Sequence, residues 1–219
     1  MTRWLTASLD SPSRDAETFW REATGSTLSP RRDAHGDFVT LLPAQGDAFL
    51  RMLLVDDGPA RAHLDLHVDD VAAEASRMVQ RGASVVREQD ERVALRSPAG
   101  LPFCLVPWRG ESVWPEAGGR RHRMCLDVPS ASYDVEGRFW SAALRRERTT
   151  PLNVVMRRLD GGRAGMHLHV ESTDRQADTQ RHLRAGASIE RVAADRTVLR
   201  DPAGREYCLT DVNPRSSTG

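Results

Sequence analysis

The chain has 219 residues, which is enough for one large domain or two domains of ordinary size. Its content of 39% hydrophobic and 28% charged residues, together with the lack of a ~20-residue apolar run or a secretory signal, predicts a soluble, cytoplasmic protein with no membrane partner. Acidic and basic residues balance at 31 each, and the basic clusters are short and diluted by acids, which argues against nucleic acid as a partner.

In chain order, alternation of apolar and polar residues first predicts a half-buried strand from Leu5 to Leu9. A helix should follow over 13–24, because its apolar residues share one stripe that ends at a glycine. Two strands, at 38–43 and 49–55, complete this first group. The same order then restarts around a helix capped by Asp70. The strands expected in this second group are 62–68, 84–87, 92–96 and 102–107.

The second half of the chain repeats the first. The segment SPAGLPFCLVPW begins at Ser97, and a related segment, DPAGREYCLTDV, begins 104 positions later (201 − 97) at Asp201. A strand-and-helix segment and the Leu-Asp-x-Pro and Phe-Trp motifs also return in the second half. We therefore predict two domains made of four strand–helix–strands groups. Their expected bounds are 1–108 for the first domain, 109–120 for a linker, 121–213 for the second domain and 214–219 for a tail.

This order of motifs, with a closing strand that reads Pro-Ala-Gly and then Cys-Leu, resembles the vicinal oxygen chelate superfamily. That superfamily includes glyoxalase I, extradiol dioxygenases and bleomycin-resistance-type proteins. The HLDLHVDD segment and the Phe-Trp pairs resemble its actinobacterial glyoxalase-like branch. The resemblance implies an α+β fold of tandem βαβββ modules, with curved mixed sheets, helices on the convex face and a ligand inside the curve. The fourfold recurrence of strand–helix–strands predicts two similar domains related by a pseudo-twofold, each with a sheet of eight or nearly eight strands and two main helices. We expect a monomeric pseudo-dimer or a homodimer.

Period-two alternation indicates which side chains face the inside of each curved sheet. In the strand at 62–68 the leucines should pack on the helices, so the residues between them share the concave face with a cysteine of the closing strand. On the first strands, the inward residues are expected to be Trp4, Thr6 and Ser8 and their counterparts Arg121, Arg123 and Cys125. The expected ligand-binding residues are Trp4, His63, Asp65, His67, Cys104, Arg123, His167, His169 and Cys208.

The same positions argue against the metal that related proteins hold. The three cysteines form neither a disulfide framework nor a CxxC pair. The resemblance implies a glutamate ligand where this chain has Cys104 and Cys208, and a histidine where it has His63 and Gly165. We therefore expect no metal and no other cofactor. The alternative is a relocated zinc or iron site on the concave face of the first domain, although His63 and His67 lie roughly 13 Å apart along their strand.

Three functions follow from these expectations. The first is a metal-free protein that binds an aromatic or cationic small molecule. The second is a metal-dependent lyase, isomerase or dioxygenase of the same superfamily with a relocated site. The third is a folded partner module with an occluded cavity.

Several of these side chains also have structural interpretations. Asp65 is expected either to attract a cation, to serve as a base in proton transfer, or to be a buried, hydrogen-bonded carboxylate. Cys104 and Cys208 are expected as buried fillers rather than nucleophiles, because no cationic neighbour in the sequence would lower their pKa. Trp108 and Trp114 are better candidates for stacking on a planar ligand than the Phe-Trp pairs, whose helical spacing is typical of core residues.

Overall fold

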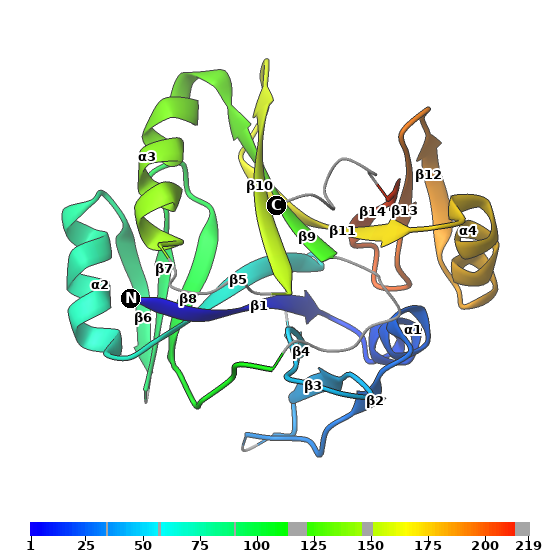
Figure 1. Cartoon of the computed structure of the whole chain (residues 1–219), viewed down its shortest axis with the longest axis horizontal. Helices are drawn as coiled ribbons and strands as arrows, with labels where there is room; N and C mark the ends of the chain where they lie inside the picture. The colour runs from blue at the N-terminus through cyan, green and yellow to red at the C-terminus, as the bar shows by residue number, and fades with distance from the viewer. Residues whose placement is uncertain (34, 57, 90, 114–121, 146–150, 213–219) are drawn as a thin grey trace.

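The computed structural model describes residues 1–33, 35–56, 58–89, 91–113, 122–145 and 151–212. These residues form two curved mixed sheets, one of eight strands and one of six, with α-helices packed on them (Figure 1). Trp114, Arg121, most of the expected linker and the expected tail lie outside the described residues. Within them, no helix is long and apolar enough to cross a membrane.

The eight-stranded sheet belongs to the first domain. Its strands are β1 (Thr2–Ser11), β2 (Thr27–Leu28), β3 (Phe38–Leu42), β4 (Leu50–Leu54), β5 (Arg61–Val68), β6 (Ser84–Gln89), β7 (Arg92–Arg96) and β8 (Pro102–Pro107). Its helices are α1 (Asp15–Thr24) and α2 (Val71–Gln80). The strand order is β2-β3-β4-β1-β5-β8-β7-β6. At the centre β1 and β5 are antiparallel, and each has a parallel neighbour, β4 and β8 respectively.

The six-stranded sheet belongs to the second domain and repeats this centre. Its strands are β9 (His122–Pro129), β10 (Leu152–Leu159), β11 (Gly165–Ser172), β12 (Ser188–Val192), β13 (Arg196–Arg200) and β14 (Glu206–Asp211). A 3-10 turn (Ser130–Ser132) leads into α3 (Tyr133–Ala143), and α4 (Arg175–Arg184) follows β11. The order is β10-β9-β11-β14-β13-β12, with β9 and β11 antiparallel.

The third of the four predicted strand–helix–strands groups is shorter than predicted. In the first group, residues 25–49 between α1 and β4 supply the two strands β2 and β3. In the third group only residues 144–151 separate α3 from β10, and β10 pairs directly with β9. The described part of the second sheet therefore ends at β10, and lacks counterparts of β2 and β3 because the chain between helix and strand is shorter.

The first helix of each domain packs against the other domain. Trp20 of α1 contacts Tyr207 of β14, with ring centroids 5.1 Å apart, and Trp140 of α3 contacts Phe103 of β8 at 5.4 Å. Figure 1 shows the result, with α3 beside β8 and α1 beside α4. All four rings are almost fully buried in one core that joins the domains. The Phe-Trp pairs are thus core, as their helical spacing predicts.

Candidate functional site

The leucines and the polar residues of β5 lie on opposite faces of the first sheet. Leu64 and Leu66 are part of the core that joins the domains. His63, Asp65 and His67 lie on the other face, and their exposed fractions are only 7, 0 and 1%. We call this face, with Cys104 of the neighbouring strand β8, the first cup.

A row of four charged side chains crosses the first cup. His63 lies between two carboxylates, with Nδ1 3.2 Å from Asp10 Oδ2 and Nε2 3.3 Å from Asp65 Oδ1. The other oxygen of Asp65, Oδ2, is 3.4 Å from Nη1 of Arg51 on β4. Two acidic groups therefore alternate with two basic groups along a line from β1 to β4.

Within this row, the neighbouring side chains determine the protonation states of His63 and Asp65. Burial alone would lower the pKa of His63, but hydrogen bonds with Asp10, Asp65 and the Cys104 thiol raise it well above its usual value. Burial likewise opposes ionisation of Asp65, yet His63 and Arg51 hold its pKa well below the usual range. At neutral pH His63 is therefore an imidazolium, and Asp65 is a buried carboxylate whose charge is already neutralised.

The other expected residues of the first cup contact partners within the protein. Trp4 is 2% exposed, and its Nε1 donates to a backbone carbonyl at 3.0 Å. His67 shares a 2.8 Å hydrogen bond with Thr6, and its Nδ1 lies 3.1 Å from Glu111. Trp108 carries an arginine from β1 over its ring at 5.5 Å. Trp4 and His67 therefore have partners within the protein, and one face of the Trp108 ring is covered by the arginine.

In the second sheet, two histidines of β11 meet a cysteine of β9, and we call this face the second cup. Cys125 lies opposite His167 in the strand register. The Nε2 atoms of His167 and His169 are 2.7 Å apart, and one ring nitrogen of each histidine and Cys125 Sγ all lie within 4.8 Å of one another. On its other side His167 turns Nδ1 toward Asp127 Oδ2 at 3.3 Å. Arg157 holds Asp127 through hydrogen bonds of 2.7 and 2.8 Å.

Burial keeps the thiols and one imidazole of the second cup neutral. It raises the pKa of Cys125 to about 12, with the charge of Asp127 adding to the effect. It raises the pKa of Cys208 to about 11 as well. Burial, and then the charge of His167, lowers the pKa of His169 to about 3. Neither thiol is therefore a nucleophile at neutral pH in the free protein.

The remaining expected residues of the second cup lie beside this cluster. Cys208 is next to His169 in the register of β11 and β14, but its sulfur is not one of the converging atoms. Arg123 of β9 forms an ion pair with Glu171. Arg123 therefore has a carboxylate partner of its own and is not placed to bind a ligand by charge alone.

The two cups are built on equivalent positions. The equivalent pairs are Asp10 and Asp127, Ser8 and Cys125, His63 and His167, and Asp65 and His169. In both cups the first histidine turns Nδ1 toward the aspartate. The counterpart of His63 is therefore His167, and the expectation that Gly165 takes this place is wrong. Gly165 lies opposite Asp127, two residues earlier on β11.

Sequence reasoning missed several residues of these networks, among them Asp10, Asp127 and Arg51. Asp10 and Asp127 belong to the Leu-Asp-x-Pro motif that both halves share, and this recurrence is the signal that could have identified them. Arg51 carries no such signal. Its position is set by the parallel pairing of β4 with β1, in which Arg51 lies beside Ser8.

Two cavities open beside the cups. One of ≈ 810 Å³ lies at the first cup, and its wall includes Arg32, Phe38, Arg51 and Val106 but neither His63 nor Asp65. The other, of ≈ 800 Å³, lies where β5 and β11 begin, between the two domains. Its wall includes Asp127 and His167, so the second cup is reached from this cavity.

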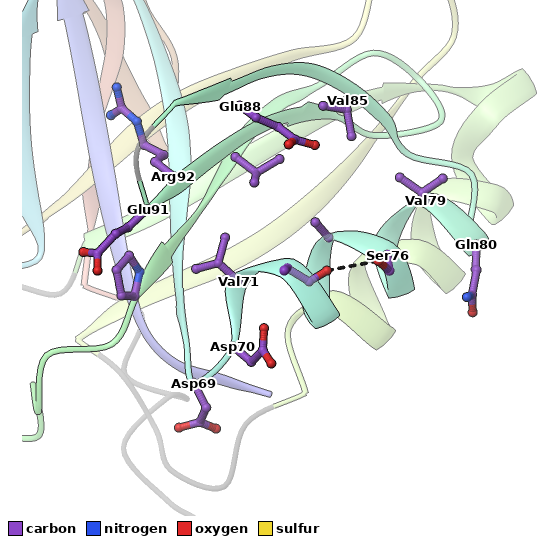
Figure 2. A pocket seen from close by; sticks show the side chains of 14 residues that line it. Asp69, Asp70, Val71, Ser76, Val79, Gln80, Val85, Glu88, Glu91 and Arg92 are labelled. Carbon is purple, nitrogen blue, oxygen red and sulfur yellow. Dashed lines mark hydrogen bonds between the residues drawn. The ribbon is translucent and has the colours of Figure 1, made fainter.

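A third hollow, of ≈ 920 Å³, lies between α2 and the β6–β7 hairpin (Figure 2). Val71 and Val79 of the helix and Val85 of the hairpin line it, with carboxylates such as Asp69 and Glu88 at its edge. None of the expected site residues borders it. It is the space that α2 leaves where it covers the edge of the sheet incompletely.

A family model described as "Glyoxalase-like domain" matches residues 7–106 and 123–210. The chain belongs to this glyoxalase-like family. Its solved structural relatives are distant in sequence but cover nearly the whole chain. Searching the curated proteins finds no match.

Three solved structures illustrate the likeness of the glyoxalase-like protein to the vicinal oxygen chelate superfamily. A mutant 4-hydroxymandelate synthase from Streptomyces coelicolor is 15% identical, with 97% of this chain and 93% of that chain covered and a TM-score of 0.60. The Mn(II)-bound glyoxalase from Novosphingobium aromaticivorans is also 15% identical, with 96% and 82% covered and a TM-score of 0.61. Homoprotocatechuate 2,3-dioxygenase from Arthrobacter globiformis is 12% identical, with 98% and 82% covered and a TM-score of 0.62. Identities this low show the shared fold alone.

These relatives raise the question of whether the glyoxalase-like protein suits a metal. In the first cup His63, Asp65 and Cys104 also bring donor atoms within 4.8 Å of one another, but the guanidinium of Arg51 and the imidazolium of His63 already neutralise Asp65, which makes these donors a poorer set for a divalent cation. In the second cup Val155 stands where Arg51 stands in the first, because the two pair with the equivalent residues of β1 and β9. Two imidazoles and a thiol converge there. Such nitrogen and sulfur donors suit zinc and similar transition metals better than hard ions that prefer oxygen.

Proposed function

We propose that the glyoxalase-like protein binds a small organic acid, a carboxylate on a planar or apolar body, in the cavity of the first cup. The observation that carries this proposal is a pair of guanidinium groups on one aromatic ring. Arg32 lies over Phe38 at 4.7 Å, and Arg51 lies over the same ring at 5.7 Å. All three residues line the cavity.

The two guanidinium groups leave a net positive charge at this ring. Burial, and then the charge of Arg51, lowers the pKa of Arg32. Arg51 has Asp65 as a counter-ion, whereas Arg32 has no ion pair among the described residues and donates to the Thr40 hydroxyl instead. A carboxylate placed between them would relieve the repulsion. It would also accept the paired hydrogen bonds that a planar guanidinium offers.

The rest of the cavity wall supports this polarity. Two of its four acidic residues are in ion pairs, Asp37 with Arg14 and Glu91 with Arg109, and its five arginines outnumber the four acids. Further arginines in the wall are Arg87, Arg92 and Arg109, and its apolar residues are Phe38, Leu53, Leu54, Val106 and Pro107. A volume of ≈ 810 Å³ lies within the ~300–1,000 Å³ of small-molecule sites. The apolar wall can therefore hold the body of a ligand while the arginines hold its acid group.

This proposal reverses the ligand charge expected from the sequence. The sequence alone suggests that Asp65 attracts a cationic ligand. In the structure the charge of Asp65 is neutralised by His63 and Arg51, and Asp65 is 0% exposed. The group that faces the cavity is the arginine, and its charge selects an anion.

The test compares ligands of matched shape and different charge. Isothermal titration calorimetry would use aryl and alkyl carboxylates, such as phenylacetate and hexanoate, beside the amide and amine analogue of each. We expect carboxylates to bind and their amide and amine analogues to bind at least about tenfold more weakly, since a hydrogen bond to a charged group contributes about 1.5–3 kcal/mol.

The matched variant is Arg32→Gln, because Arg32 lines the cavity and, unlike Arg51, is not the ion-pair partner of Asp65. It should weaken carboxylate binding by about 10–100-fold, from the same energy range. The control is Arg77→Gln on the exposed face of α2, which should bind carboxylates as the wild type does. Equal binding of carboxylate and amine, or undiminished binding by Arg32→Gln, would refute the proposed function.

A further inference from the structure

We propose that the second cup holds a zinc-class divalent transition metal through Cys125, His167 and His169. The inference is independent of the proposed function, because it concerns the other domain and a different kind of ligand. Its basis is geometric. One sulfur and two imidazole nitrogens from the paired strands β9 and β11 lie within 4.8 Å of one another.

The arrangement of the two imidazoles suits a metal better than it suits a hydrogen bond. Their Nε2 atoms face each other at 2.7 Å, and at most one proton fits between them. In a tetrahedral zinc site with Zn–N bonds of about 2.0–2.1 Å, two nitrogen ligands lie about 3.3 Å apart. An opening of about half an ångström therefore converts the pair into metal ligands. The buried thiol of Cys125 completes a set of three soft and borderline donors.

The groups behind the donors already have the arrangement of a metal site. His167 turns Nδ1 toward Asp127, 3.3 Å away, which leaves Nε2 as the atom that faces the cluster. Arg157 in turn holds both oxygens of Asp127. A carboxylate on the far nitrogen of a ligating histidine fixes the ring orientation and raises its basicity.

Comparison with the first cup shows why the second is the metal site. There, Ser8, Arg51 and Asp65 occupy the positions of Cys125, Val155 and His169. The first cup thus contains a cation and its counter-ion, and the second replaces them with a thiol, an apolar side chain and an imidazole. The three changes together remove the guanidinium from this position, add a thiol donor and replace a carboxylate donor by an imidazole.

Three protein donors leave a fourth tetrahedral position for water or a ligand, which is the pattern of reactive rather than purely structural zinc sites. The cavity of ≈ 800 Å³ between the domains reaches His167, so this position has an entry route. Five arginines stand in its wall, Arg61, Arg96, Arg163, Arg200 and Arg205. An anionic molecule is therefore the class of ligand that this cavity would bring to the metal.

Cobalt(II) is the most direct probe, because a thiolate ligand to tetrahedral Co²⁺ produces both visible absorption and a near-ultraviolet charge-transfer band. The full chain, made metal-free with a chelator under reducing conditions, would be titrated with Co²⁺. We expect both features to saturate at about one equivalent per chain and Zn²⁺ to abolish them by displacement. Absence of the charge-transfer band at every cobalt concentration would overturn the proposal without any mutant.

Variants locate the site. Cys125→Ser should lose the charge-transfer band, and His169→Ala should lower cobalt affinity by at least about tenfold. Asp127→Asn should keep the band and weaken binding by about 10–100-fold, because Asp127 acts through His167. The matched control is Cys104→Ser, a buried cysteine on the same face of the other domain, which should leave spectrum and stoichiometry unchanged. Loss of the band in Cys104→Ser, or its retention in Cys125→Ser, would overturn the assignment; far-ultraviolet circular dichroism verifies that each variant is folded.

Discussion

Replacing Asp65 by asparagine tests the row of charged side chains in the first cup most directly, because the change removes a charge and leaves the shape. It leaves His63 and Arg51 without their shared counter-ion. Removing one partner from a buried ion pair costs about 3–5 kcal/mol. Arg51 remains 19% exposed, and His63 keeps Asp10. We therefore expect a loss of about 3 kcal/mol, at the lower end of that range.

Urea denaturation at pH 6, followed by circular dichroism, measures this loss as a lower midpoint with an unchanged slope. For a chain of this size it corresponds to a melting temperature about 6–12 °C lower. The double-mutant cycle with Arg51→Gln should show a coupling of at least about 0.5 kcal/mol, as residues in one ion-pair network do. A loss below about 1 kcal/mol, the value of an exposed pair, would refute the interpretation of Asp65 as a buried counter-ion.

The pH dependence of this loss has a defined sign. The pKa of Asp65 is lowered in the folded protein, so its stabilising effect is present above the unfolded value of about 4 and is lost as the pH falls through the folded value. The pKa of His63 is raised, so its contribution is complete below about 6.5 and disappears as the pH rises through the folded value. The difference between the wild type and Asp65→Asn should therefore be largest at about pH 5–6.5 and smaller on both sides.

Two further predictions concern the core and the thiols. Trp20→Ala should lower the free energy of unfolding by about 3–5 kcal/mol, because it removes the contact with Tyr207 that joins the domains. The control, Trp108→Ala, should change this free energy by less than about 1 kcal/mol, because Trp108 is 37% exposed. Equal losses in urea denaturation would contradict the shared core. All three cysteines should resist iodoacetamide in the native protein at pH 8 and react after denaturation, since all are buried and the pKa values of Cys125 and Cys208 are about 12 and 11. Rapid native alkylation of any of them, seen by mass spectrometry, would contradict this.

The sequence predicts those features that depend on local pattern and repetition. Alternating leucines place His63 and Asp65 on the face opposite the core, and the repeated motifs predict two domains of one fold. The sequence predicts less well what depends on pairing between distant strands. Arg51 reaches Asp65 only because β4 lies beside β1, and this contact changes the sign of the expected ligand charge. The described part of the second sheet lacks counterparts of β2 and β3 because of the length of one connection, which its residue pattern does not reveal.

The pairing of distant strands also explains why the spacing of histidines along one strand is not enough to predict a metal site. Two histidines four residues apart on one strand are too distant to share an ion, and His67 is indeed held elsewhere by Thr6 and Glu111. In the second cup the histidines are two residues apart, and their rings lean together until Nε2 of His167 and His169 are 2.7 Å apart. The third donor comes from the neighbouring strand, which spacing along one strand does not consider.

Duplication offers a physical reason for two cups with different chemistry. Both retain an aspartate at the end of the first strand that contacts the first histidine, Asp10 with His63 and Asp127 with His167. The residue that follows this histidine on the same face of the strand, Asp65 in the first cup and His169 in the second, determines the chemistry of each cup. A carboxylate at position 65 requires a cation, which Arg51 supplies, and the guanidinium then faces the cavity. An imidazole at position 169 needs no counter-ion, and its Nε2 stays directed at the first histidine, where a metal ion can bridge the two.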